Sequence, residues 1–101
     1  MQSNKITIQE IIDRSVPHLI EGRRTTIETD RFVLSIVGGA IGLYGDFQED
    51  FEVAIIDKNT REFVTKMFEP DATDDVMGYV PADKVVEIAN YFVEKNVSKL
   101  D

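Results

Sequence analysis

The sequence contains no cysteine and no tryptophan, and His18 is its single histidine. Without cysteine the chain cannot form a disulfide framework, a thiolate zinc site or a cysteine nucleophile. Long apolar runs are also missing, because the longest stretches extend over a few residues and a membrane-spanning helix needs about 20. Glu10 and Asp13 interrupt the segment in which a signal peptide would be apolar. We therefore expect a cytoplasmic protein that has no membrane partner.

Basic residues are scarce, with 11 Lys and Arg against 19 Asp and Glu and a net charge of -8. Residues 1–31 contain five residues of each sign, so the whole net charge lies in residues 32–101. Binding to nucleic acid or to an anionic membrane requires a basic surface that neutralises phosphates. The composition therefore predicts no direct contact with nucleic acid and favours a protein partner with a basic surface.

The 101 residues, 43% of them hydrophobic, have the size and apolar content of one domain, residues 1–101. A chain of this length builds one hydrophobic core and has little room for a separate cofactor domain. No repeat, low-complexity tract or linker divides it. One function must therefore be carried by one small scaffold.

The first element predicted is a helix. Thr7 followed by Glu10 is a capping-box pattern, and apolar residues recur at helical spacing after it. We expect a helix over about residues 8–21, kinked near Pro17 because proline lacks an amide donor, and ended by Gly22.

Four strands are predicted next, as two hairpins. The first hairpin pairs residues 24–29 with residues 32–37 around Thr29 and Asp30, which places Ile27 opposite Phe32.

The second hairpin pairs residues 51–57 with residues 61–68 across a three-residue loop. This loop length brings apolar side chains opposite one another on one face. The facing pairs are Phe51 with Met67, Val53 with Thr65, and Ile55 with Phe63.

A second helix opens at Pro81 and can end at Asn96, because an apolar stripe recurs between them at helical spacing. The stripe consists of Val85, Ile88, Ala89 and Phe92. The element order is then α-β-β-β-β-α, which predicts an α+β fold in which a four-stranded antiparallel sheet is flanked by an N-terminal and a C-terminal helix. The core is expected to join the second hairpin to Ile12, Leu19, Ile88 and Phe92.

Residues 38–50 form a long connection between two strands, where two to five residues are usual. Glycines recur at every third position, and Tyr44 and Phe47 lie among them. One interpretation is a binding loop, because glycine lets the backbone approach a ligand and aromatic side chains supply contact area. The other is a glycine-assisted bend whose apolar residues fold over the core.

Two stretches contain acidic residues and no base. They are Asp46, Glu49, Asp50 and Glu52, and Glu69, Asp71, Asp74 and Asp75. Carboxylates could bind calcium or magnesium, but these stretches lack the alternating spacing and the central glycine of an EF-hand loop. We therefore expect no metal site.

Other chemistry is also disfavoured. The glycines are followed by acids and a strand rather than by a helix N-terminus, so they do not match a nucleotide-binding loop. Ser15 and His18 are close in sequence, with Asp13 nearby, but nothing indicates an oxyanion hole or a buried base. The sequence predicts a protein that is not an enzyme and that has no cofactor.

Two functional hypotheses follow. In the first, a small acidic protein-binding or accessory module docks through the glycine-rich loop, and the acids supply steering. In the second, the acidic stretches imitate phosphates and inhibit a basic nucleic-acid-binding protein, as proteins of mobile elements do. A homodimer through an exposed sheet face is left open. The predicted partner-binding residues are Gly39, Gly42, Tyr44, Gly45, Asp46, Phe47, Glu49, Asp50, Asp71, Asp74 and Asp75.

Overall fold

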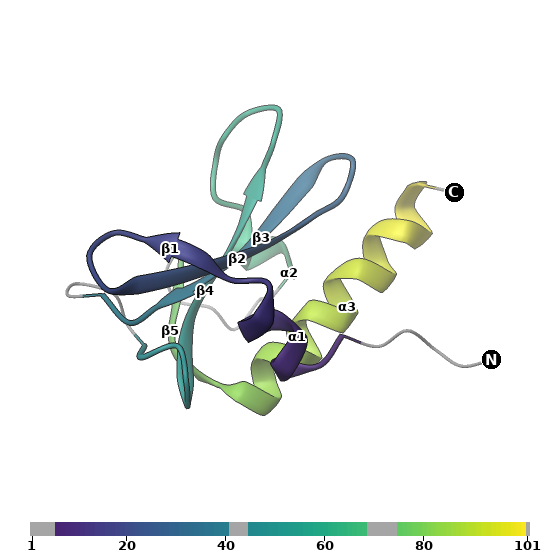
Figure 1. Ribbon diagram of the computed structural model, residues 1–101. Helices are drawn as coiled ribbons and strands as arrows, with labels where there is room; N and C mark the ends of the chain where they lie inside the picture. The colour runs from purple at the N-terminus through teal and green to yellow at the C-terminus, as the bar shows by residue number, and fades with distance from the viewer. Residues whose placement is uncertain (1–5, 41–44, 69–74, 101) are drawn as a thin grey trace.

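A computed structural model describes residues 6–40, 45–68 and 75–100. The elements in these ranges are α1 (Ile8–Asp13), β1 (Val16–His18), β2 (Gly22–Glu28), β3 (Phe32–Gly38), β4 (Asp50–Asp57), α2 (Thr65–Phe68), β5 (Met77–Pro81) and α3 (Ala82–Leu100). The strands form one antiparallel sheet in the order β1-β2-β3-β4-β5 (Figure 1). The α+β class and the flanking helices are as predicted, but the sheet has five strands rather than four.

The N-terminal helix is shorter than predicted. Its capping box is present, since the Glu10 amide donates to the Thr7 hydroxyl at 3.2 Å and the Thr7 amide donates to the Glu10 carboxylate at 3.3 Å. The helix ends at Asp13, and Pro17 lies in the middle of β1 instead of kinking a longer helix. A residue that precedes proline is pushed toward extended conformations, which makes Val16 a strand residue.

The first hairpin is confirmed, but its register differs by two residues. Ile27 lies opposite Leu34 rather than Phe32, because the turn is centred on Asp30 and Arg31. Thr29 closes this turn: its amide donates to the Phe32 carbonyl at 2.9 Å and its hydroxyl accepts from the Phe32 amide at 3.1 Å. A shift of two residues leaves every side chain on its predicted face.

The second predicted hairpin is wrong. β4 pairs with β5, and the segment after β4 forms no strand ladder with it, although an isolated bridge joins Ile56 and Phe63. Thr65 starts α2, where its hydroxyl accepts from the Ile55 amide at 2.9 Å and donates to the Asp75 carbonyl at 2.6 Å. This side-chain contact takes the place of a strand ladder.

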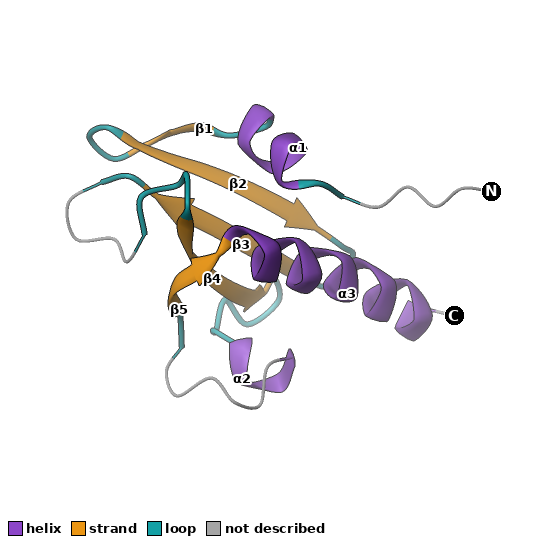
Figure 2. Cartoon of the chain, turned by 90° about the horizontal axis from the view of Figure 1, so that it is seen from below, coloured by secondary structure: helices purple, strands orange, loops and turns teal. Residues whose placement is uncertain are grey.

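The core lies between one face of the sheet and the helices. Figures 1 and 2 show α3 passing along this face with α1 beside it. The predicted helical stripe of α3 is buried, and the helix continues past Asn96 to Leu100. Of the predicted core, Leu19 and Phe63 are exposed and Met67 lies in α2. The larger core residues are Ile11, Phe32, Leu34, Ile36, Phe47, Phe51, Val53, Ile55, Val80, Val85, Ile88 and Phe92.

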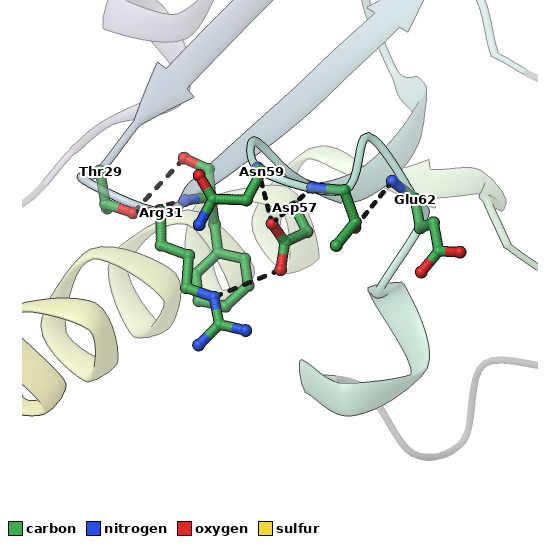
Figure 3. A network of polar contacts seen from close by, with 7 residues as sticks. Thr29, Arg31, Asp57, Asn59 and Glu62 are labelled. Carbon is green, nitrogen blue, oxygen red and sulfur yellow. Dashed lines mark hydrogen bonds and ion pairs between the residues drawn. The ribbon is translucent and has the colours of Figure 1, made fainter.

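A polar network holds one end of the sheet together (Figure 3). The Asp57 carboxylate accepts from the amides of Asn59 at 2.8 Å and Thr60 at 3.2 Å, and it pairs with the Arg31 guanidinium at 3.3 Å. Burial raises the pKa of the Asp57 carboxyl, but these amides and the guanidinium outweigh it and hold the pKa below its ordinary value. The Lys58 amide adds a bond to the Arg31 carbonyl at 2.7 Å. The turns after β2 and after β4 are thus joined.

Candidate functional site

The turn between β1 and β2 projects from the opposite end of β2, at the left of Figure 1. We call residues 19–21 the hairpin tip. Leu19 is 64% exposed and Ile20 is 84% exposed, so the tip presents two aliphatic side chains to solvent. Leu19 and Glu21 have φ angles of 58° and 65°, a left-handed conformation that residues with a Cβ adopt at a cost of about 1–2 kcal/mol each.

The chain is closely packed at Gly22, directly below the tip. A Cβ added at Gly22 would lie 2.3 Å from the His18 carbonyl oxygen and 2.8 Å from the Ala40 Cβ, so only glycine fits. The tip is therefore pressed against the chain that leaves β3.

A hollow of about 410 Å³ opens beside the tip. It is mostly apolar and is lined by Leu19, Ile20, Glu21, Gly39 and Ala40. Gly39 lies where three segments meet. A Cβ placed on Gly39 would be 3.2 Å from the Glu21 carbonyl oxygen and 3.6 Å from the Asp46 carbonyl oxygen. Its φ of 85° also favours glycine. Concave apolar sites of this kind accept an apolar group from a ligand or a partner.

The acidic turn before β4 is built around Asp46. Its carboxylate accepts from the amides of Gln48, Glu49 and Asp50 at 2.8, 2.9 and 3.2 Å, and the Asp46 amide donates to the Asp50 carboxylate at 2.9 Å. The backbone bonds from Glu49, Gln48 and Asp50 hold the pKa of the Asp46 carboxyl below its ordinary value. Asp46 and Asp50 therefore stabilise their own turn, while the Glu49 side chain is exposed.

Phe47 is buried, in agreement with the interpretation of this connection as a bend folded over the core, and is not presented at the surface as its place among the predicted partner-binding residues required. It is 5% exposed, and its ring packs edge-on against Phe51 with the centroids 5.1 Å apart. Gly45 lies against the Phe51 backbone, where an added Cβ would approach to 2.7 Å. The second half of the glycine-rich connection thus folds over the core, whereas Gly39 and Ala40 in its first half line the hollow.

The other predicted residues are spread over the chain. Gly42, Tyr44, Asp71 and Asp74 lie outside the described residues. Asp75 is exposed, and its backbone carbonyl accepts from Thr65. The structure thus brings together Gly39 and the Asp46 turn but not Asp75.

Sequence reasoning missed Leu19 and Ile20, because it placed both in the N-terminal helix. The signal was Pro17, which a continuous helix accommodates only with a kink. Reading Pro17 as the end of the helix would have placed both residues in a turn before Gly22.

The Ser15 hydroxyl bonds to Ile12 and Arg23 rather than to His18. The Ser15 hydroxyl donates to the Ile12 carbonyl at 2.7 Å and accepts from the Arg23 guanidinium at 3.0 Å. In the described ranges, no group of three His, Asp or Glu side chains could hold a metal ion. Nor does any helix of these ranges have the length and apolar character needed to cross a membrane.

No family model, no curated protein and no solved structure matches this chain.

Proposed function

We propose that the protein is a small acidic protein-binding module without catalytic activity, and that its partner docks on the hairpin tip and the adjacent hollow. The observation that carries this proposal is the exposure of two neighbouring aliphatic side chains, Leu19 and Ile20, beside an apolar hollow. Neither side chain contributes to the protein's own core. Fully burying such a side chain is worth about 1.5–3 kcal/mol, and a partner can supply that burial.

The backbone of the tip supports the same proposal. Leucine at a φ of 58° is strained, and residues in such strained conformations cluster at binding sites and active sites. Directly below the tip, Gly22 packs closely against His18 and Ala40. The tip is a preformed projection, so little conformational entropy is lost when a partner binds.

Charge specifies the partner further. Glu21 lines the hollow, and Glu49 is exposed on the turn whose Asp46 backbone adjoins Gly39. With a net charge of -8, the protein attracts a basic surface and repels an acidic one. We therefore propose a partner that inserts an apolar side chain and carries Lys or Arg around it.

The experiment uses a photoreactive amino acid at position 20, with position 91 on α3 as the control. Ile20 and Tyr91 are both exposed apolar positions, 84% and 47% exposed respectively. In native extract, a specific crosslinked partner should form from position 20 and not from position 91. Ile20→Asp should then weaken binding of that purified partner about tenfold or more, while Tyr91→Asp leaves it unchanged. Equal crosslinking from both positions would contradict the proposal.

Phosphate mimicry is the competing outcome of the same experiment. It would require carboxylates that face a basic partner, yet Asp46 and Asp50 are engaged within their own turn. If Glu49→Gln and Asp75→Asn abolish binding while Ile20→Asp has no effect, and affinity falls steeply with salt, mimicry is the better explanation.

A further inference from the structure

Two backbone carbonyl groups converge beside the hollow. A Cβ placed on Gly39 would be 3.2 Å from the Glu21 oxygen and 3.6 Å from the Asp46 oxygen, so both oxygens lie close to one point. Gly39 has no side chain to cover this point and is itself exposed. A ligand that enters the hollow therefore meets two carbonyl oxygens, one from the hairpin tip and one from the turn before β4.

Both oxygens are available as hydrogen-bond acceptors. The strand pairing of β2 with β3 ends at Arg23 and Gly38, before it reaches Glu21. In the turn before β4, the backbone bonds run from the Gly39 amide to the Gly45 carbonyl and from the Phe47 amide to the Asp50 carbonyl. Among the described residues, no backbone amide donates to the carbonyl of Glu21 or Asp46. Such groups take their hydrogen bonds from water or from a ligand.

Negative charge surrounds the two oxygens. The Glu21 side chain lines the hollow, and Glu49 is exposed on the turn that contains Asp46. Arg23 is the nearest basic residue to Glu21 in the sequence, but its guanidinium donates to the Ser15 hydroxyl at 3.0 Å and to the Ser15 carbonyl at 2.7 Å. The site thus offers acceptors and carboxylates, which favours a cationic donor.

An ammonium group fits these acceptors better than a guanidinium. An ammonium has three donors that point in different directions, so it can bond two separate carbonyls and face a carboxylate. A guanidinium is planar, and its fork matches the two oxygens of one carboxylate or phosphate. The pair of backbone oxygens therefore selects an ammonium.

The closeness of the apolar and polar parts of the site distinguishes the two ammonium groups of proteins. Gly39 lines the hollow and also lies beside both carbonyls, so the apolar group and the ammonium of the ligand must be close together. In an N-terminal residue, the α-ammonium and the side chain are attached to the same carbon atom. In lysine the ammonium ends a flexible stem of four carbons, and the apolar side chain belongs to another residue.

We propose that the hollow binds the N-terminal residue of the partner protein, with an apolar side chain against Leu19 and Ile20 and the α-ammonium on the carbonyls of Glu21 and Asp46. This inference rests on the proposed function and names the part of the partner that docks. Capture of an N-terminal amine by backbone groups is a recurring mode of peptide recognition. The hollow of about 410 Å³ also lies within the range of small-ligand sites, about 300–1,000 Å³.

The test is fluorescence anisotropy with short peptides that carry a dye at the C-terminus, titrated with the full chain up to about 1 mM. The first peptide begins with leucine and has a free α-amine, followed by glycine, serine and lysine. In the second peptide the leucine is acetylated, and an added lysine near the dye keeps the net charge unchanged. We expect the free amine to bind about tenfold or more tightly than the acetylated form, because acetylation removes the charged donor.

Two protein variants locate the peptide on the hairpin tip. Ile20→Ser removes apolar contact and Glu21→Gln removes a carboxylate, and both change exposed side chains. Each should weaken binding of the free-amine peptide by about threefold or more. Glu94→Gln makes the same change as Glu21→Gln at an exposed position on α3 and should leave binding unchanged.

Three results would overturn the inference. The first is equal binding of the free and acetylated peptides with loss in Ile20→Ser, which would leave docking at the tip intact but show that the amine is not read. The second is binding that neither Ile20→Ser nor Glu21→Gln changes, because the peptide would then lie elsewhere. The third is no binding of the free-amine peptide at about 1 mM protein. Crosslinking from position 20 decides the proposed function independently of all three.

Discussion

The side-chain amide of Asn90 on α3 pairs with the backbone of Ile6, 84 residues earlier. Its Oδ1 accepts from the Ile6 amide at 2.8 Å, and its Nδ2 donates to the Ile6 carbonyl at 3.0 Å. Nδ2 also donates to the Val86 carbonyl at 2.9 Å. One side chain thus fixes the segment before α1 against the last helix.

Loss of this clamp should lower stability. Asn90→Ala removes all three bonds and leaves the Ile6 amide and carbonyl without their partner, so we expect the free energy of unfolding to fall by about 1–3 kcal/mol. Asn59→Ala is the matched control, because Asn59 contributes its backbone amide to the Asp57 turn. Urea denaturation measures both, and equal midpoints for the two variants would show that the clamp contributes nothing.

The Thr65 hydroxyl should contribute more to the stability of the fold than the methyl group of the same side chain. Thr65→Val leaves the buried Ile55 amide and the Asp75 carbonyl without a partner and should cost about 1–3 kcal/mol. Thr65→Ser retains both hydrogen bonds and should be closer to the wild type. If thermal denaturation places Thr65→Ser below Thr65→Val, the hydrogen bonds are not the stabilising contribution.

Acid should destabilise the protein through Asp57. Its pKa in the folded protein is below the ordinary value of about 3.9, so the folded state binds this proton more weakly than the unfolded state. The contribution to stability is therefore complete above about pH 5 and is lost as pH falls through the folded pKa. Asp57→Asn should flatten this part of the pH dependence. The measurement is unfolding of the wild type and of Asp57→Asn between about pH 2 and pH 6. A parallel loss of stability in the two proteins would contradict the prediction.

Phe47 should contribute to the stability of the fold, and Ile20 should contribute to partner binding. Phe47→Ala removes a core ring and should destabilise the fold by about 3–5 kcal/mol, whereas Ile20→Ala should change stability by less than about 0.5 kcal/mol. Binding of the partner crosslinked from position 20 should weaken in Ile20→Ala. A folded, fully stable Phe47→Ala protein would show that the ring is not part of the core.

Local signals explain which parts of the fold could be predicted. The Thr7–Glu10 capping box and the buried stripe of α3 were correct because both depend on residues three or four positions apart. The Thr29 turn preserved the predicted faces of the first hairpin even though its register moved. The second hairpin failed because its alternation fits two outcomes: Thr65 can face Val53 in a ladder, or it can bond Ile55 through its hydroxyl.

Only one half of the candidate site could be predicted, because the other half depends on how β1 pairs with β2. Its glycine-rich side was identified from composition, and Gly39 lines the hollow. The apolar side was missed, because Leu19 and Ile20 read as helix residues until β1 is paired with β2.

The sequence by itself determined the α+β class, the two terminal helices, the central hairpin and the acidic net charge, all of which follow from composition or from neighbours in the chain. The tertiary structure decided that β4 pairs with β5, that Phe47 is buried and that Ile20 is exposed. These outcomes depend on contacts between distant segments, such as Phe51 with Val80 and Gly22 with Ala40. An apolar residue is equally apolar in a core or on a turn, and only its neighbours in space determine whether water reaches it.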